Sequence, residues 1–150
     1  MLAKNTVLTG RRAITRSYAK INLTLDVLSK RENGYHDIKM IMQTVSLFDL
    51  ILVDKTHRGI SISTNLPYLP CNEKNIAYKA ADTFFKATGI RGGAKIVIHK
   101  NIPVAAGLAG GSGNCAAVLT AMNMLHGNPL SNDELMHIGA SLGADVPYCF

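Results

Sequence analysis

A glycine-rich stretch at positions 102–114, IPVAAGLAGGSGN, holds the residues best suited to chemistry. An apolar β-like run at 95–99 precedes it, and an apolar helix-like run at 115–125 follows it. A glycine-rich turn that opens a helix brings unpaired backbone N–H groups up to a ligand, and the helix dipole adds partial positive charge there. The stretch therefore predicts a phosphate site, as in a nucleotide-dependent enzyme, although its composition also suits a flexible loop.

Two common phosphate loops do not fit this stretch. A Walker A loop needs a lysine after its second glycine, and no lysine follows any glycine here. A Rossmann loop needs G-x-G-x-x-G/A directly after a strand. Positions 111–116 match those letters, but Pro103 and a run of small residues separate them from the strand. The acidic residue expected about 20 positions later would fall at 131–134, where a helix is predicted to begin. We therefore interpret the Rossmann match as accidental.

Five further residues carry side chains suited to chemistry. Lys20 lies inside an apolar strand pattern, where a lysine either faces solvent or is paired or functional, and Asn22 shares its strand face. Asp145 follows a helix, where an aspartate is commonly a turn or cap residue. Tyr35 and His36 follow an Asn-Gly turn, where a histidine is usually exposed. The other histidines and the scattered cysteines show no ligand spacing, so no structural metal site is predicted.

The elements that must position these residues are strands followed by helices. Alternating apolar residues predict strands at 13–28, 35–47, 49–54 and 59–63, and an edge-like strand at 94–99. Helical periodicity predicts helices at 75–88, 112–126 and 131–142, the last with an S-x-x-E capping box and with Gly143 as its stop. The segment 144–150 reads as the start of an apolar strand. The pattern predicts an α+β fold with a mixed sheet packed on helices, and we expect the chain to be the N-terminal part of a longer protein.

Composition favours one soluble domain of 150 residues with a substantial core. No apolar run approaches the roughly 20 residues of a membrane helix, and residues 1–12 lack the apolar centre of a signal peptide. Three widely spaced cysteines fit a reducing cytoplasm. The net charge of +6 is spread along the chain, which favours steering of phosphorylated ligands over nucleic-acid binding. We expect a cytoplasmic protein with neither a membrane nor a nucleic-acid partner.

A third class of phosphate loop, P-x-x-x-G-L-(G/A)-rich-S before an Ala-rich helix, matches Pro103, Gly107, Leu108 and Ser112. On these residues the chain resembles the GHMP kinase superfamily of small-molecule kinases. The segments AKINLTL and NGYH, which begin at Ala19 and Asn33, resemble the family's first motif. The segment GADVP, which begins at Gly143, resembles its catalytic aspartate segment. Through these segments the chain resembles the branch of the superfamily that phosphorylates a cytidyl diphosphate alcohol for isoprenoid biosynthesis.

The resemblance implies a fold like the second domain of ribosomal protein S5. Residues 17–150 would form the N-terminal ATP-binding domain of a GHMP kinase, with the C-terminal domain absent and residues 1–16 as an N-terminal extension. It also implies ATP as the phosphoryl donor, Mg²⁺ accompanying ATP, and a 2-hydroxyl of the cytidyl substrate as the acceptor. Because half of the cleft is missing, we expect this chain alone to be weakly active or inactive.

The resemblance assigns a role to each candidate residue. Asp145 would accept the proton of the substrate hydroxyl, Lys20 would keep Asp145 ionised, and Asn22 would orient the substrate. Tyr35 would stack on the cytosine and His36 would hydrogen-bond to it. The implied ATP-binding residues are Pro103, Val104, Ala105, Ala106, Gly107, Leu108, Ala109, Gly110, Gly111, Ser112 and Gly113, together with Asn75 and Lys100.

Two positions depart from the family pattern. Gly113 stands where a second Ser or Ala is usual, and Cys115 stands where Ala is preferred. Two alternatives remain beside the cytidyl-alcohol kinase. One is a GHMP kinase that acts on another alcohol. The other is a non-enzymatic RNA-binding module on the same fold, which the basic charge favours and the acidic Asp145 disfavours.

Overall fold

The computed structural model describes residues 2–30, 34 and 36–150, in which five strands form one sheet in the order β1-β2-β3-β5-β4. The strands are β1 (Thr6–Thr9), β2 (Arg12–Lys30), β3 (His36–Thr56), β4 (Gly59–Thr64) and β5 (Gly93–His99). Strands β4 and β5 are parallel and the other neighbours are antiparallel. The predicted mixed sheet is confirmed. The prediction of an edge strand at 94–99 is wrong, because the parallel pairing with β4 places β5 inside the sheet.

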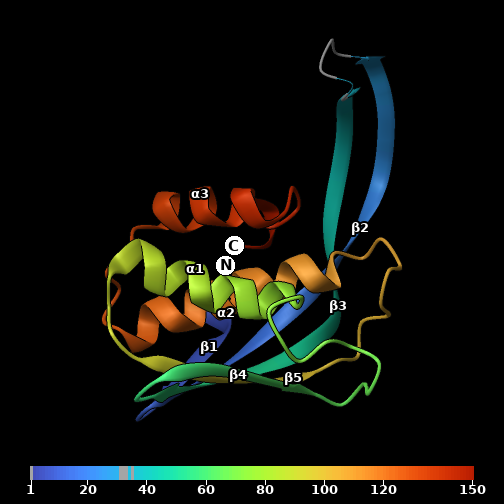
Figure 1. Cartoon of the computed structure of the whole chain (residues 1–150). Helices are drawn as coiled ribbons and strands as arrows, with labels where there is room; N and C mark the ends of the chain where they lie inside the picture. Colours follow the sequence, from blue (N-terminus) through green and yellow to red (C-terminus); the bar gives the residue numbers. More distant parts are fainter. Residues whose placement is uncertain (1, 31–33, 35) are drawn as a thin grey trace.

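The helices lie on one face of this sheet (Figure 1). They are α1 (Ile76–Thr88), α2 (Gly110–Leu125) and α3 (Asn132–Leu142), with 3₁₀ turns η1 (Leu2–Asn5) and η2 (Pro147–Cys149). Helix α2 is the central one, since it contacts β2, β3, α1 and α3. All its residues from 113 to 123 are buried. Small side chains such as Ala116, Ala117 and Ala121 let the neighbouring elements approach it closely.

Two helix starts agree with the caps that the sequence indicates. The Asn75 side chain accepts a hydrogen bond from the Ala77 amide at 3.0 Å and caps α1. Ser131 and Glu134 form the predicted capping box, in which each side chain bonds to the other residue's backbone N–H. Helix α2 begins at Gly110, inside the glycine stretch and before the predicted position 112.

Two strand predictions are wrong in their extent. Strand β3 runs without a break through Phe48, where the sequence suggested two strands. The segment 144–150 forms turns and η2 rather than a strand, because Pro147 has no N–H and fits the first turn of a helix. Residues 2–16, which the resemblance leaves outside the family domain, form η1, β1 and the start of β2. The Leu2 amide donates to the Phe150 carbonyl at 3.0 Å.

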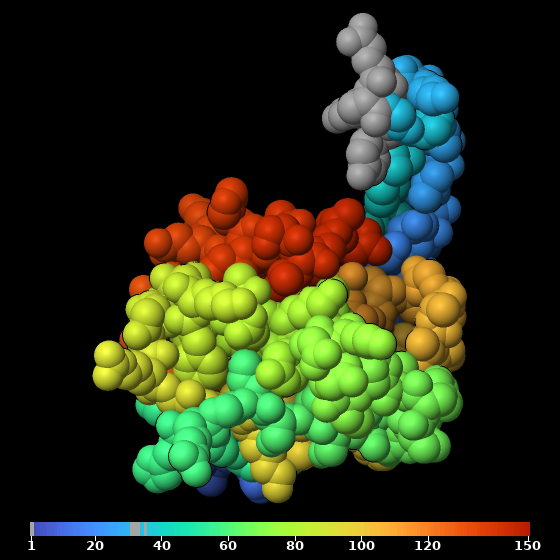
Figure 2. Space-filling view, in the orientation of Figure 1, coloured from blue at the N-terminus to red at the C-terminus, as the bar shows by residue number. Residues whose placement is uncertain are grey.

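Strands β2 and β3 extend past the helices as a two-stranded arm, residues 21–30 and 36–43, which stands clear of the body (Figures 1 and 2). Many of its apolar side chains are exposed, among them Leu23, Leu25 and Val27. The pairing of β2 with β3 shifts register between Tyr18 and Lys20, at the base of the arm. Such bulges re-aim side chains next to functional sites. No helix within the described residues is long and apolar enough to cross a membrane.

Candidate active site

The loop between β5 and α2 presents the start of α2 to a cavity. Ala109, the residue before α2, has φ 56° and makes no side-chain capping bond. Ala105 and Gly107 also have positive φ, at 58° and 73°, so the loop turns tightly three times before the helix begins. The first amides of α2 therefore lack a side-chain acceptor from the capping position. An uncapped helix N-terminus of this kind is suited to an anion.

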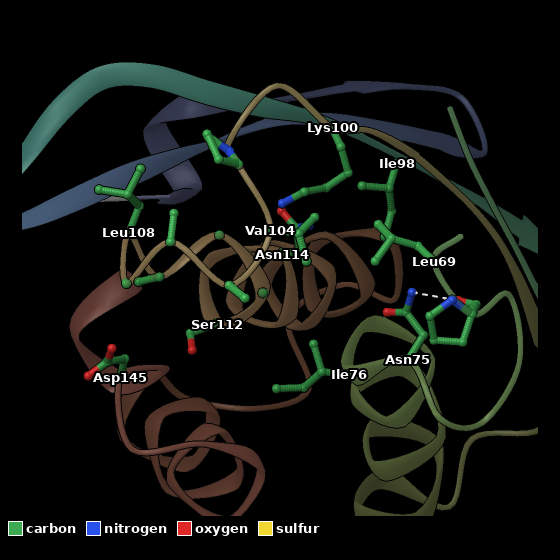
Figure 3. A pocket seen from close by; sticks show the side chains of 18 of the residues that line it. Leu69, Asn75, Ile76, Ile98, Lys100, Val104, Leu108, Ser112, Asn114 and Asp145 are labelled. Atoms are coloured by element: carbon green, nitrogen blue, oxygen red, sulfur yellow. Dashed lines mark hydrogen bonds between the residues drawn. The ribbon is translucent and has the colours of Figure 1, made fainter. Parts of the chain in front are cut away.

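The cavity beside this loop has a volume of about 490 Å³ and two chemically different ends. Figure 3 shows Ser112 and Asp145 at one end, and Leu69, Ile98 and Asn75 at the other. The first end combines a hydroxyl, a carboxylate and the start of α2. The second is mostly apolar, which suits a flat organic ring more than a charged group.

Lys20 and Asp145 form an ion pair at the polar end, although they are far apart in the sequence. The Lys20 Nζ lies 3.6 Å from Asp145 Oδ2, and the two side chains are 7% and 41% exposed. Lys20 Nζ also donates to Asn22 Oδ1 at 3.1 Å, on the same strand face. Its backbone amide donates to the Leu108 carbonyl at 3.1 Å, which ties the bulge in β2 to the loop. The lysine is thus held by three elements, while the carboxylate remains accessible.

The pair lies between two cavities. Asp145 lines the large cavity, and Lys20 lines a second one of about 320 Å³ together with Thr44 and Tyr148. A carboxylate that faces an open cavity and has a buried ammonium behind it can accept a proton from a bound alcohol. The Lys20 ammonium also places a positive charge 3.6 Å from this carboxylate.

The two cysteines near the site are not nucleophiles at neutral pH. Burial raises the pKa of the Cys149 thiol to about 11, with a further contribution from the negative charge of Asp145. Burial also raises the pKa of Cys115 to about 12. Since the thiolate is the reactive form, both side chains act as small apolar groups. Cys149 Sγ donates to the Asp145 carbonyl at 3.3 Å and supports that turn.

Most of the residues predicted to bind ATP line the large cavity. They are Pro103, Val104, Ala105, Ala106, Gly107, Leu108, Ala109, Gly110, Gly111, Ser112, Asn75 and Lys100. Gly113 instead lines the second cavity, and a Cβ there would overlap Ser17 Oγ. The amide of Asn75 is already engaged, because besides capping α1 it donates to the Pro70 carbonyl at 2.8 Å.

His36, one of the two residues predicted to recognise cytosine, lies apart from both cavities. His36 is exposed at the start of β3 on the arm, and it lines neither cavity. Tyr35 lies outside the described residues. Asn22 contacts Lys20 through the hydrogen bond above but also lines neither cavity.

Sequence reasoning missed three polar residues of this region. Lys74 and Asn114 line the large cavity, and Asn114 Oδ1 is buried with no hydrogen-bond partner in the described part of the chain. Asp49 is fully buried on β3 and bonds to Lys100. The available signals were an asparagine at the start of an Ala-rich helix and an aspartate inside an apolar strand, both of which are rarely buried without a partner.

The described residues contain no group of three or more His, Cys, Asp or Glu side chains placed to hold a metal ion. Among the described residues that line the large cavity, Asp145 is the one carboxylate. A divalent cation at this site would therefore depend on oxygen ligands from a bound phosphate, as Mg²⁺ commonly does.

The sheet, the helices and the uncapped start of α2 beside a Lys–Asp pair define a class of small-molecule kinases. The chain belongs to the GHMP kinase family: residues 75–150 match the domain described as "GHMP kinases N terminal domain". It is 52% identical over 134 residues to a 4-diphosphocytidyl-2-C-methyl-D-erythritol kinase of Clostridium botulinum (strain Alaska E43 / Type E3). It is 54% identical over 135 residues to the enzyme of the same name from Clostridium perfringens (strain ATCC 13124).

These alignments cover 89% of this chain but 48% and 47% of the two relatives. The chain therefore spans about half the length of the curated relatives it matches. A crystal structure of 4-(cytidine 5'-diphospho)-2C-methyl-D-erythritol kinase superposes with a TM-score of 0.79 at 36% identity, covering 90% of this chain and 47% of that one. A homoserine kinase from Cytophaga hutchinsonii shares the fold, with a TM-score of 0.67 at 19% identity over 92% of this chain and 44% of that one.

Proposed function

We propose that this chain is the ATP-binding half of a kinase that phosphorylates the 2-hydroxyl of 4-diphosphocytidyl-2-C-methyl-D-erythritol in non-mevalonate isoprenoid biosynthesis. The observation that carries the proposal is the Lys20–Asp145 pair, 3.6 Å apart, at the same cavity as the uncapped start of α2. The names of the relatives at 52–54% identity support the choice of substrate.

The residues at the polar end have different roles in phosphoryl transfer. Asp145 accepts the proton of the substrate hydroxyl, so that the hydroxyl oxygen becomes the attacking nucleophile. Lys20 keeps that carboxylate ionised beforehand and offsets the negative charge that collects on the transferring group. The first amides of α2 hold the phosphates by hydrogen bonds and by the dipole of the helix.

The cavity fits ATP by the chemistry of its two ends. The apolar end, with Leu69 and Ile98, accepts the adenine, and the loop from Pro103 to Ser112 accepts the triphosphate. When bound, ATP would supply the phosphoryl group. The Asp145 carboxylate and the phosphate oxygens of ATP would be the ligands for Mg²⁺, which would offset the charge of the phosphates.

The remaining predictions extend this proposal. Tyr35 and His36 recognise the cytosine, His36 from its place on the arm, and Asn22 orients the alcohol near Lys20. The protein works in the cytoplasm, in keeping with its three free thiols. The RNA-binding alternative is not favoured, since the relatives are named as kinases and an acidic side chain lies at the mouth of the cavity.

The experiment compares Asp145→Asn with Asp133→Asn, an exposed residue in the first turn of α3. ATP affinity is measured on this chain by titration calorimetry, and turnover on the longest natural form of the protein. We expect Asp145→Asn to retain ATP binding and to lower kcat by about 10³-fold or more, while Asp133→Asn changes neither. Near-normal kcat for Asp145→Asn would exclude Asp145 as the base.

Substrate choice is tested by assaying the cytidyl alcohol beside homoserine and mevalonate. We expect phosphorylation of the cytidyl alcohol alone, and preference for either of the others would replace the proposed substrate. The same assay run on this chain by itself should give little or no turnover. Turnover equal to that of the longer form would show that this half is sufficient.

A further inference from the structure

Asp49 lies where the backbone pairing of β3 with β5 ends. The last paired residues are Leu50 and His99, so Asp49 and Lys100 are the next residue on each strand. Beyond them the chain leaves the sheet to form the phosphate loop. The amides of Asn101 and Ile102 would lose their partners at this point, although Ile102 is only 1% exposed.

The Asp49 carboxylate supplies the hydrogen-bond acceptors that a paired strand would otherwise provide at this point. Its Oδ1 accepts hydrogen bonds from the amides of Asn101 and Ile102, both at 2.8 Å. Its Oδ2 accepts a hydrogen bond from Lys100 Nζ. Asp49 is 0% exposed, so water cannot substitute for these bonds, and the first residues of the loop are fixed to β3.

Lys100 links the Asp49 carboxylate to the other end of the loop, where α2 begins at Gly110. A Cβ built on Gly110, the first residue of α2, would lie 2.9 Å from Lys100 Nζ and 3.0 Å from Ile102 Cγ2. The start of α2 therefore rests directly on the two residues that Asp49 holds. The Lys100 backbone is fixed as well, since its N–H donates to Asn65 Oδ1 at 2.7 Å and its carbonyl accepts from Asn65 Nδ2 at 3.1 Å.

We propose that Asp49 is a positioning residue for phosphoryl transfer, which sets both ends of the phosphate loop through its bonds to Asn101, Ile102 and Lys100. It touches neither ATP nor the alcohol. Lys100 is occupied by Asp49 in this role and serves as a support beneath Gly110, in place of a direct contact to the nucleotide. The inference rests on the proposed function, because it takes the loop to be the triphosphate site.

Two double variants separate the hydrogen bonds of Asp49 from its charge. Asp49→Asn with Lys100→Met removes both charges but keeps an oxygen for the two amides. Asp49→Ala with Lys100→Met also removes both charges and takes that oxygen away. The two variants have the same charge and differ in the side chain at position 49, which keeps an oxygen acceptor in the first and has none in the second. Each variant is checked for cooperative unfolding before ATP affinity is measured by calorimetry.

We expect the Asn/Met variant to bind ATP within about threefold of the wild type, and the Ala/Met variant to bind at least tenfold more weakly. Equal, wild-type affinity in both would refute a positioning role. An equal loss in both would instead assign the effect to the charge of Lys100 acting on the phosphates. If the Ala/Met variant unfolds cooperatively and still binds ATP tenfold more weakly, the weaker binding results from the lost positioning and not from loss of the fold.

Amide hydrogen exchange on the wild-type chain tests the same idea without substitution. The amides of Asn101 and Ile102 should be protected before ATP is added and unchanged after it. Protection that arises only with ATP would show that the arrangement is not preformed, and would overturn the proposal. If the wild type binds no ATP, the proposed function fails, whereas the protection of these two amides still reports on the role of Asp49.

Discussion

The contact between Ser17 and Gly113 predicts a strong energetic coupling between β2 and the first turn of α2. Ser17 is 0% exposed, and its hydroxyl has no hydrogen-bond partner among the residues that the structure describes. A Cβ on Gly113 would overlap that hydroxyl oxygen but would lie 3.8 Å from Ser17 Cβ, an ordinary contact. The side chain usual at position 113 in the family is therefore excluded here by the hydroxyl of Ser17 alone.

The magnitude follows from three opposing effects. Gly113→Ala by itself inserts a methyl group into filled space, which costs about 1–3 kcal/mol. The gain in helix propensity offsets at most about 1 kcal/mol of that cost. With Ser17→Ala in the background the overlap disappears, and so does an unsatisfied buried hydroxyl whose desolvation costs about 1–3 kcal/mol. We expect the double variant to be at least as stable as the wild type, with a coupling energy of about 1–3 kcal/mol.

The assay is urea denaturation of the four proteins of the cycle, supported by thermal melts. Each 1 kcal/mol corresponds to about 2–4 °C in Tm for a chain of this size. Gly111→Ala is the control, because its Cβ would meet only Ile76 Cγ2 at 3.8 Å and should cost no stability. A coupling energy within about 0.5 kcal/mol of zero would refute the packing argument.

Two further predictions concern stability away from the cavity. Burial first, and then the charge of Lys55, lowers the pKa of His126, whose ring packs against Phe84. His126 in the unfolded chain therefore becomes protonated at a higher pH than His126 in the folded chain. We expect the free energy of unfolding to fall as the pH drops below about 6.5. His126→Gln should remove that part of the pH dependence of the urea midpoint. Ser131→Ala removes one half of the capping box of α3 and should cost about 1 kcal/mol in the same assay, whereas an unchanged midpoint would show that Glu134 alone supports this helix start.

The parts of the fold that were predictable are those fixed by local chemistry. Asn75 and Ser131 cap their helices because their side chains reach amides two or three residues away, and sequence spacing alone reveals this. The internal place of β5 was not predictable, because it depends on a parallel partner that a 28-residue connection separates from it in the sequence, from position 65 to 92. Strand alternation reports burial of a face and not which neighbour lies beside it.

The candidate site likewise contains residues that could be predicted from the sequence and residues that could not. The glycine stretch was recognisable because its composition has few structural explanations. Lys20 and Asp145 were candidates from their surroundings in the sequence, but their roles came only from the resemblance to a family. Asp49 gave only the weak signal of an aspartate in an apolar strand pattern, and the sequence placed it at the start of a separate strand at 49–54. Its partners, the amides after β5, are backbone groups that no sequence pattern marks.

The conformation of the loop explains why such anchors are needed. Ala105 and Ala109 both have positive φ, a region that costs an L-residue roughly 1–2 kcal/mol compared with glycine. Strain of this kind persists only where the surroundings fix the chain on both sides. Here the loop is attached to β3 at its start, to the bulge in β2 through Leu108, and to Lys100 beneath Gly110. The strained turns aim backbone amides at the cavity, and the bonds to the sheet keep them there when no ligand is bound.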